Sequence, residues 1–288
     1  MQKIPIRQLS QSQKVHPIAE QFKIRRIEDI IGEKDLVHNL HRHDFFFILS
    51  LKNGQGKHEV DFVSHTVLDH SIFFLRPGQV HQLLLKAGST GYLLEFNHKF
   101  YNPRETTANQ RLRKASNKNF CEFETGRFNK LQAALESMLQ EYTAREEGYQ
   151  DMIRSNLDIF CIEYSRQSPG PNSASSVASS YTQERLEKFL ELLNKHMAKF
   201  KQVSDYVDLM NLSPYQLNEI TKSSIGKTPS ELINENIILE AKRYLLATPN
   251  QIKEIAESLG YEDVSYFIRF FKKHTGYSPD LFRHSFRP

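Results

Sequence analysis

The sequence predicts an α+β protein of two domains: a small antiparallel β-barrel with a helical hairpin, then an all-α domain of two helix-turn-helix units joined by a long helix. Short β-branched and aromatic runs cut by turn residues fill residues 22–100. Helical periodicity dominates from residue 183 onward, and the segment between the two halves has no periodicity. A chain of 288 residues also exceeds one typical domain.

Composition and charge exclude several protein classes. With 39% hydrophobic and 25% charged residues, the chain is globular and neither fibrous nor disordered. Its two cysteines, Cys121 and Cys161, lack disulfide-framework or metal-ligand spacing, which suits a reducing compartment. No run approaches the ~20 apolar residues that span a bilayer, and a signal-peptide core is missing. We therefore expect a cytoplasmic protein with no membrane partner. The net charge of +4 permits a polyanionic partner.

The strand signals lie in residues 1–167. Turn residues stand where hairpin reversals are expected, at Asn53-Gly54, Pro77-Gly78 and Gly88. Many short strands in succession favour a small antiparallel barrel or a sandwich.

A helical hairpin is expected at about residues 127–167. Apolar residues recur there at helical spacing on two stretches, with Gly148 between them. The hairpin either packs onto its own domain or forms a homodimer, and the sequence leaves both open. Residues 168–182 are expected to be a flexible linker, because "SPGPNSASSVASS" holds only small residues, Pro, Asn and Val.

Residues 183–288 contain an internal duplication. A shift of 50 residues pairs Leu217 with Phe267, Lys222 with Lys272, Gly226 with Gly276, Pro229 with Pro279 and Leu232 with Phe282. Each copy has a short amphipathic helix, "VSDYVDLM" or "IKEIAESL", then a tight turn and a second helix, "SPYQLNEITKSS" or "DVSYFIRFFKKH". This is the order of a helix-turn-helix unit, whose second helix enters the major groove of DNA.

The connecting helix has clear boundary signals. Thr228 to Glu231 is a capping box at its start, as Ser213 to Gln216 is for the preceding helix, each with Pro at the first helical position, and Pro249 ends the connecting helix "PSELINENIILEAKRYLLA". At ~1.5 Å per residue this helix spans about 27 Å. It could hold two reader helices about one turn of B-DNA apart, roughly 34 Å, in consecutive major grooves.

The stretch "IKEIAESLGYEDVSYFIRFFKKHTGYSPDLFR" and its upstream copy resemble the AraC family of bacterial transcription regulators over about residues 186–286. The family pattern is I..IA...G, an aromatic residue, then F.R.FKK..G.SP...R. The resemblance implies a regulator that reads promoter DNA. It implies base contacts from eight residues: Tyr215, Gln216, Asn218, Glu219, Val264, Ser265, Ile268 and Arg269.

Arg269 is the strongest candidate for reading guanine, since a guanidinium donates bidentately to O6 and N7. The alternatives are a phosphate contact or an ion pair with Glu262 or Asp263. Phosphate contacts are expected from Lys222, Lys272 and Lys273. The first unit departs from the family pattern, because Glu219 stands where Arg is frequent.

The stretches "HNLHRHDFFFILS" and "FFLRPGQVHQ" resemble the two halves of a cupin barrel, which AraC-type regulators carry as a sensor. The candidate effector pocket is lined by His41, His43, Arg76, His81 and Glu95. The three histidines could instead hold Zn, Fe or Ni, or be satisfied within the barrel. The carboxylate that metal cupins place after the histidine pair is missing, and an apolar stretch from Phe45 to Ile48 occupies its place.

The sequence therefore predicts a sequence-specific transcription regulator without a cofactor. Its expected partners are double-stranded promoter DNA, a small-molecule effector, RNA polymerase and a second copy of the chain. The alternative is a metal-dependent cupin enzyme, a dioxygenase or isomerase, fused to a DNA-binding tail. Effector identity and the direction of regulation stay open.

Overall fold

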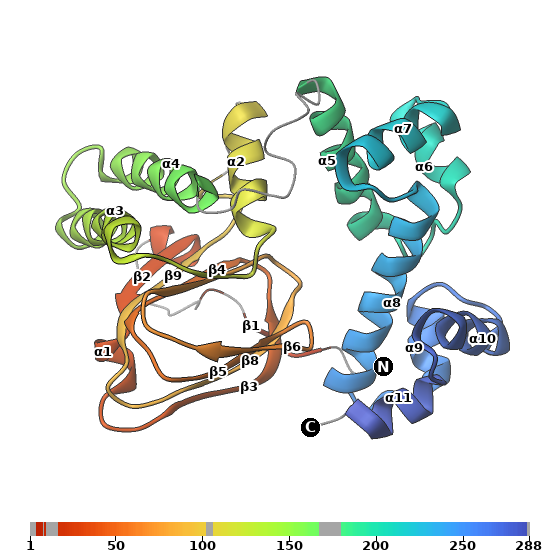
Figure 1. Cartoon of the computed structure of the whole chain (residues 1–288), viewed down its shortest axis with the longest axis horizontal. Helices are drawn as coiled ribbons and strands as arrows, with labels where there is room; N and C mark the ends of the chain where they lie inside the picture. Colours follow the sequence, from red (N-terminus) through yellow and green to blue (C-terminus); the bar gives the residue numbers. More distant parts are fainter. Residues whose placement is uncertain (1–3, 8, 10–16, 102–105, 167–179, 287–288) are drawn as a thin grey trace. The chain divides into compact units, whose positions relative to one another are not determined.

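The computed structural model describes residues 4–7, 9, 17–101, 106–166 and 180–286. The described residues from Pro5 to Arg166 form one compact unit, and those from Ser180 onward belong to a second (Figure 1). The predicted linker, residues 168–182, lies outside the described residues except for its last three, which begin α5 (Ser180–His196).

The N-terminal unit is built on two five-stranded sheets. The first has the order β1-β3-β8-β5-β6 and the second β10-β7-β4-β9-β2; neighbours are antiparallel except for β1 and β3. The strands are β1 Ile6–Arg7, β2 Phe22–Arg26, β3 Leu36–His43, β4 Phe46–Asn53, β5 Gly56–Val60, β6 Val63–Val67, β7 Ser71–Leu75, β8 Val80–Leu85, β9 Thr90–Phe96 and β10 Phe120–Glu122, with η1 Pro17–Glu20 and α1 Glu28–Ile31 beside them.

The predicted two-part fold class is confirmed, but the barrel is not closed. Within the described part of the chain, no strand ladder joins the two sheets. Closure needs continuous pairing between edge strands. Two of the edge strands, β1 and β10, are only two and three residues long.

The prediction of β-hairpins is wrong at all three turns. Asn53-Gly54 joins β4 to β5, Pro77-Gly78 joins β7 to β8, and Gly88 lies between β8 and β9; each turn carries the chain from one sheet to the other. The tight hairpin is β5–β6, where Asp61 (φ 46°) and Phe62 (φ 69°) form the two-residue loop. A turn residue signals a change of direction, but the sheet the next strand joins depends on distant partners.

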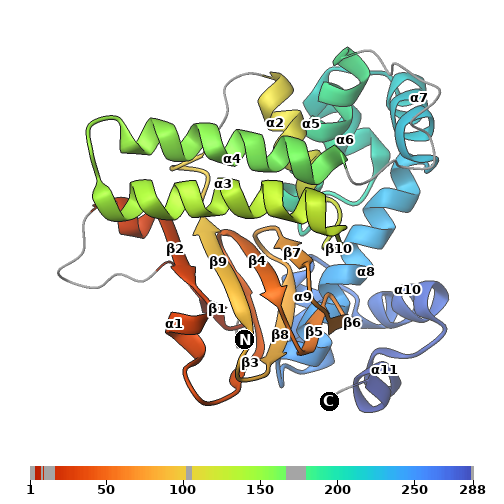
Figure 2. The same ribbon diagram turned by 60° about the vertical axis from the view of Figure 1, so that its left-hand side comes forward.

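The helical hairpin covers the outer face of the second sheet (Figures 1 and 2). It consists of α3 (Thr125–Ala144) and α4 (Tyr149–Arg166), with α2 (Thr106–Ser116) packed on α4. Outward-facing strand residues and the apolar stripes of the hairpin share one core, which contains Phe22, Ile24, Leu94, Phe96, Leu131, Leu135, Met138, Ile153, Leu157 and Phe160. These stripes therefore pack onto their own domain, while Met152 and Ile159 of α4 are about half exposed.

The second unit is all helical over its described residues. Its helices after α5 are α6 Val203–Met210, α7 Pro214–Ile225, α8 Pro229–Ala247, α9 Ile252–Ser258, α10 Val264–Thr275 and α11 Pro279–Phe286. The capping boxes predicted at Ser213 and Thr228 are both present, and α8 ends two residues before Pro249. Helix α8 buries the predicted face of Ile233, Ile237, Ala241 and Leu245. It packs against α6 and α7 with one part of its length and against α9 and α11 with another.

No helix among the described residues is long and apolar enough to cross a membrane.

The tight turn between α9 and α10 depends on Gly260. Its φ is +77°, and a Cβ at this position would lie 1.6 Å from the carbonyl oxygen of Ala198. Lys201 reinforces the same junction, because its Nζ donates to the carbonyls of Leu259 at 2.6 Å and Met197 at 2.9 Å. The end of α5 is thereby joined to the end of α9.

Gly260→Ala should destabilise the helical unit by more than about 2 kcal/mol, because left-handed strain adds to a backbone clash. Gly276→Ala is the matched control, since Gly276 has φ +80° but nothing within 4 Å of the added Cβ. That control should cost only about 1–2 kcal/mol. Urea unfolding followed by far-ultraviolet circular dichroism would measure both, and equal losses would contradict the packing role of Gly260.

Candidate nucleic-acid interface and candidate ligand pocket

Helices α7 and α10 are the second helices of the two helix-turn-helix units. Each buries one face: Leu217 and Ile220 on α7, Phe267 and Phe271 on α10. Each ends at a glycine in the left-handed conformation, Gly226 or Gly276. Residues at other positions around each helix stay accessible to a partner.

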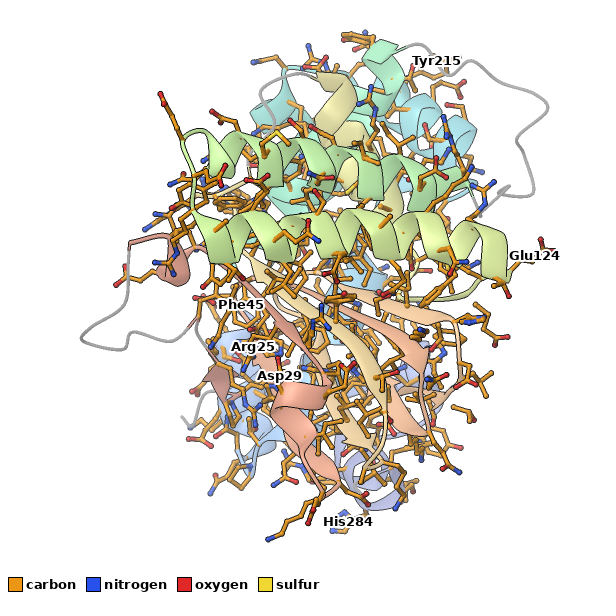
Figure 3. All side chains as sticks on the ribbon, turned by 90° about the vertical axis from the view of Figure 1, so that its left-hand side faces the viewer. Arg25, Asp29, Phe45, Glu124, Tyr215 and His284 are labelled. Carbon is orange, nitrogen blue, oxygen red and sulfur yellow. The ribbon has the colours of Figure 1, made fainter. Side chains whose placement is uncertain are left out.

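The expected base-reading residues of α7 differ in their freedom to contact a base. Tyr215, labelled in Figure 3, is 73% exposed, and Glu219 is exposed as well. Asn218 is half-buried. The side-chain oxygen of Gln216 accepts from the backbone N–H of Ser213 at 2.8 Å, so its amide hydrogens and one lone pair of this oxygen remain for a base. Bidentate pairing of Gln216 with adenine would have to share this oxygen with the cap or release it.

Helix α10 carries the second set of expected readers. Ser265 and Arg269 are exposed, while Val264 and Ile268 are half-buried. The Arg269 guanidinium lies 3.8 Å from an oxygen of Asp263, with both side chains more than 60% exposed. The other Asp263 oxygen caps α10 by accepting from the N–H of Ser265 at 2.7 Å. An exposed pair at this distance is weak, so Arg269 can leave it for a guanine or a phosphate.

The three expected phosphate ligands, Lys222, Lys272 and Lys273, are all exposed. All three lie in the last turns of their helices. The sequence interpretation missed Tyr266, which is 55% exposed in the first turn of α10. The available signal was an aromatic residue at a position of α10 outside the buried stripe of Phe267 and Phe271. The base and phosphate roles of all these residues remain predictions.

Buried histidines gather between the two sheets of the N-terminal unit. His43 Nε2 lies 2.7 Å from His81 Nε2, and His81 Nδ1 lies 2.8 Å from His58 Nε2. His41 packs against both His43 and His81, with ring centroids 4.7 Å and 4.4 Å away. The predicted trio is therefore together, and His58 is a member that the sequence interpretation missed. Its position on β5 faces the interior by strand alternation.

Burial keeps these histidines neutral. Loss of solvent is the largest cause in each case; it lowers the pKa of His43 and of His58 to about 3 and that of His38 to about 4. Burial also moves the pKa of His41 and of His81 below the ordinary value. A neutral imidazole has one donor and one acceptor nitrogen, which suits the hydrogen-bonded run from His43 through His81 to His58.

A metal ion fits this cluster poorly. The donor atoms of His41, His43 and His81 lie within 4.8 Å of one another, and His41 Nε2 is buried without a hydrogen-bond partner. Two ligands of a tetrahedral zinc ion are about 3.3 Å apart, given metal–nitrogen bonds of about 2.0–2.1 Å. The His43 and His81 nitrogens are closer than this at 2.7 Å, in hydrogen-bond contact. No carboxylate joins the cluster among the described residues.

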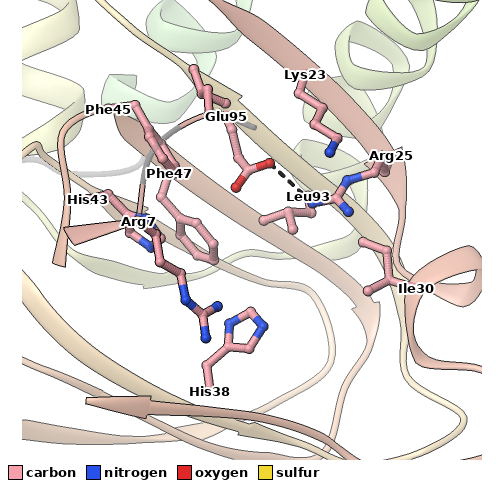
Figure 4. Close-up of a pocket in the computed structure, with 11 residues that line it drawn as sticks. Arg7, Lys23, Arg25, Ile30, His38, His43, Phe45, Phe47, Leu93 and Glu95 are labelled. Carbon is pink, nitrogen blue, oxygen red and sulfur yellow. Dashed lines mark hydrogen bonds and ion pairs between the residues drawn. The ribbon is translucent and has the colours of Figure 1, made fainter. Parts of the chain in front are cut away.

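A cavity of about 250 Å³ lies beside the histidines, between the two sheets (Figure 4). Of the expected pocket residues, His43 and Glu95 line it, and His41 and His81 lie behind His43. Arg76 is not among its lining residues, because it lies exposed beyond the end of β7 and donates to the side chain of Asn117 at 2.9 Å. The full lining is Arg7, Leu9, Lys23, Arg25, Ile30, His38, His43, Phe45, Phe47, Leu93 and Glu95.

Comparison with known families identifies both units. Residues 31–147 match a family described as an AraC-like ligand binding domain, and residues 206–285 match a family described as a helix-turn-helix domain. Together these two matches cover more than half of the chain.

Individual relatives are transcription regulators by name. The bifunctional transcriptional activator/DNA repair enzyme AdaA of Bacillus subtilis is 32% identical over 100 residues, which is 35% of this chain and 47% of AdaA. The transcriptional activator RhaS of Mannheimia succiniciproducens is 22% identical over 83% of this chain and 87% of its own. The chain spans about half the length of the first curated relatives it matches.

Among solved structures, unsaturated fatty acid bound ToxT of Vibrio cholerae is 17% identical and has a TM-score of 0.40. The match covers 91% of this chain and 95% of ToxT.

The histidine cluster should make the N-terminal unit sensitive to acid. Between the pKa of about 3 that His58 has when folded and the ordinary 6.5, the unfolded chain binds a proton that the folded chain does not. Stability should therefore fall as pH drops below 6.5, by up to about 1.4 kcal/mol per pH unit for this residue. His58→Phe should flatten the profile by that amount, and His274→Gln, an exposed control, should not. Urea unfolding with a chelator present would measure it; an unchanged slope in His58→Phe would refute the assignment.

Protein purified without chelators should hold far less than one equivalent of Zn, Fe or Ni, because the ring nitrogens of His43 and His81 already share a hydrogen bond. Elemental analysis by mass spectrometry would measure this. A stoichiometric metal that His81→Ala removes, while the exposed His274→Gln retains it, would show that the cluster is a metal site and would support the enzymatic alternative.

Proposed function

Because the chain belongs to the AraC family of transcription regulators, we propose that it binds promoter DNA sequence-specifically and that its N-terminal unit binds a small-molecule effector. The observation that carries this proposal is the pair of helix-turn-helix units held on one helix. Helix α8 has 19 residues and is therefore about 28 Å long at ~1.5 Å per residue. Consecutive major grooves on one face of B-DNA are about 34 Å apart.

The surface chemistry of the two reader helices supports a division of roles. Arg269 and Glu219 present a donor and an acceptor that suit guanine and cytosine edges. The lysines near the ends of α7 and α10 suit phosphates, which position the protein without specifying sequence. Because basic and acidic residues nearly balance in this unit, affinity would depend on where Lys222, Lys272 and Lys273 lie rather than on net charge.

The remaining partners belong to the same proposal. A homodimer would place two such pairs of readers on one operator, and the half-exposed Met152 and Ile159 of α4 are candidates for its interface. RNA polymerase is the partner through which a bound regulator would act at a promoter. Since promoter DNA lies in the cytoplasm, the proposed regulator would act there. The proposal gives the chain no enzymatic role, and the DNA repair activity in the name of AdaA is not carried over.

Selection of random duplex DNA by the full-length protein should enrich one motif with two boxes about one helical turn apart. Arg269→Ala should lose preference at one base pair, equivalent to about 1–3 kcal/mol. Lys272→Ala should weaken binding to all sequences alike and reduce the salt slope by about one. Lys57→Ala, an exposed lysine on β5, is the control and should behave as wild type.

Two results would contradict the proposal. One is enrichment of no motif by the wild-type protein, with or without candidate effectors. The other is an Arg269→Ala variant with unchanged motif and affinity, which would leave α10 without its expected reader.

A further inference from the structure

The cavity between the two sheets is lined by more positive than negative charge, with Arg7 exposed and Lys23 and Arg25 half-buried. Three of its lining residues are cationic, Arg7 on β1 and Lys23 and Arg25 on β2, against one carboxylate, Glu95 on β9 (Figure 4). Phe22 and Ile24, which alternate with Lys23 and Arg25, face outward into the core under the helical hairpin. Strand alternation therefore turns Lys23 and Arg25 toward the space between the sheets.

The single carboxylate cannot balance these cations. Glu95 forms an ion pair with Arg25, whose NH2 lies 3.1 Å from Oε2, and it is paired with Lys23 across the sheet. In the described part of the chain no ion pair is formed by Arg7 or Lys23, and Arg25 Nε is buried without a hydrogen-bond partner. The lining of the cavity therefore stays net positive, and the Nε–H of Arg25 remains a buried donor without an acceptor.

The cations also act on the pKa of neighbouring groups, after the larger effect of burial. Burial, followed by the charge of Arg25, lowers the pKa of Lys23, although Glu95 opposes this shift. Arg7 lowers the pKa of His38 and of His43, after the larger effect of burial. A bound anion between Arg7, Lys23 and Arg25 would relieve the repulsion among these three cations, because uncompensated charges in a partly dry site are costly.

The rest of the lining is apolar or neutral. Ile30, Phe45, Phe47 and Leu93 give the cavity an apolar wall, and the neutral imidazole of His43 stacks on the Phe47 ring with an interplanar angle of 8°. The volume of about 250 Å³ falls just below the range of roughly 300–1,000 Å³ that is typical of ligand pockets. The occupant should therefore be compact, with an apolar body. A neutral polyol would leave the three cations unbalanced.

We propose that this cavity binds a small organic anion, in which a carboxylate or phosphate group lies among Arg7, Lys23 and Arg25 and a compact apolar body packs on Phe45, Phe47 and Leu93. The proposal rests on the proposed function, since it names the chemical class of the effector. The binding itself can be measured without DNA.

The test is calorimetric titration of the full-length protein with benzoate, phenyl phosphate and the neutral benzamide, in a buffer free of phosphate and carboxylates. At least one anion should bind about ten- to a hundredfold more tightly than benzamide, as expected for charge-assisted hydrogen bonds in a partly buried site. The ratio of benzoate to phenyl phosphate affinity identifies which anionic group the cavity prefers.

Variants assign the binding to this cavity. Lys23→Met and Arg7→Met should each lose about tenfold or more of the anion affinity while leaving benzamide affinity unchanged. Lys57→Met is the matched control, an exposed strand lysine outside the cavity, and should bind as wild type. Thermal unfolding distinguishes a structural role: Lys23→Met should unfold no earlier than wild type without ligand, yet lose the rise in Tm that the anion produces.

Three results would overturn the proposal: anions that bind no better than benzamide, equal anion affinity in Lys23→Met, Arg7→Met and wild type, or an equal loss of affinity in Lys57→Met. DNA selection is an independent measurement. Anion binding without any enriched motif would refute the proposed DNA-binding function but not the proposed anion site. An enriched motif without anion binding would refute only the anion site.

Discussion

The buried stripe of α8 is the constraint on which the proposed reading of DNA depends. Ile233 and Ile237 begin this stripe and Ala241 and Leu245 complete it, and the helix packs against elements of both helix-turn-helix units. A continuous helix of this length without an internal Pro does not bend sharply. Helix geometry therefore limits how far the separation of α7 and α10 can change. Lys201 adds a second connection, between α5 and the end of α9.

The second sheet of the N-terminal unit imposes a comparable constraint, because both of its faces are covered. Phe22 and Ile24 face the helical hairpin, which completes an apolar core, so Lys23 and Arg25 face the interior. Charged residues on an interior face are costly unless something compensates them. The neutral histidines beside them pair with one another and add no negative charge, so Glu95 is the single carboxylate against Arg7, Lys23 and Arg25 in the lining of the cavity. The charge that lines the cavity thus follows from which strand residues the helices cover.

Much of the helical unit could be predicted because its signals are local. The capping residues Ser213 and Thr228 act within three residues of themselves, and helical spacing defines the buried face of α8 without knowledge of distant partners. The 50-residue duplication was equally reliable: Leu217 and Phe267 are both fully buried, and Gly226 and Gly276 both adopt the left-handed conformation. The ion pair of Arg269 with Asp263 is one of the alternatives that the sequence leaves open for that side chain.

The sequence by itself determined the two-part organisation, the helix boundaries and the gathering of His41, His43 and His81, because each depends on spacing along one element or a recognisable motif. Tertiary structure alone decided that the turns at Asn53-Gly54 and Pro77-Gly78 connect different sheets, that Arg76 lies outside the cavity, and that Arg7, Lys23 and Arg25 line it. The physical reason is that alternation along a strand defines two faces but not which is interior. That choice is made by partners distant in the chain.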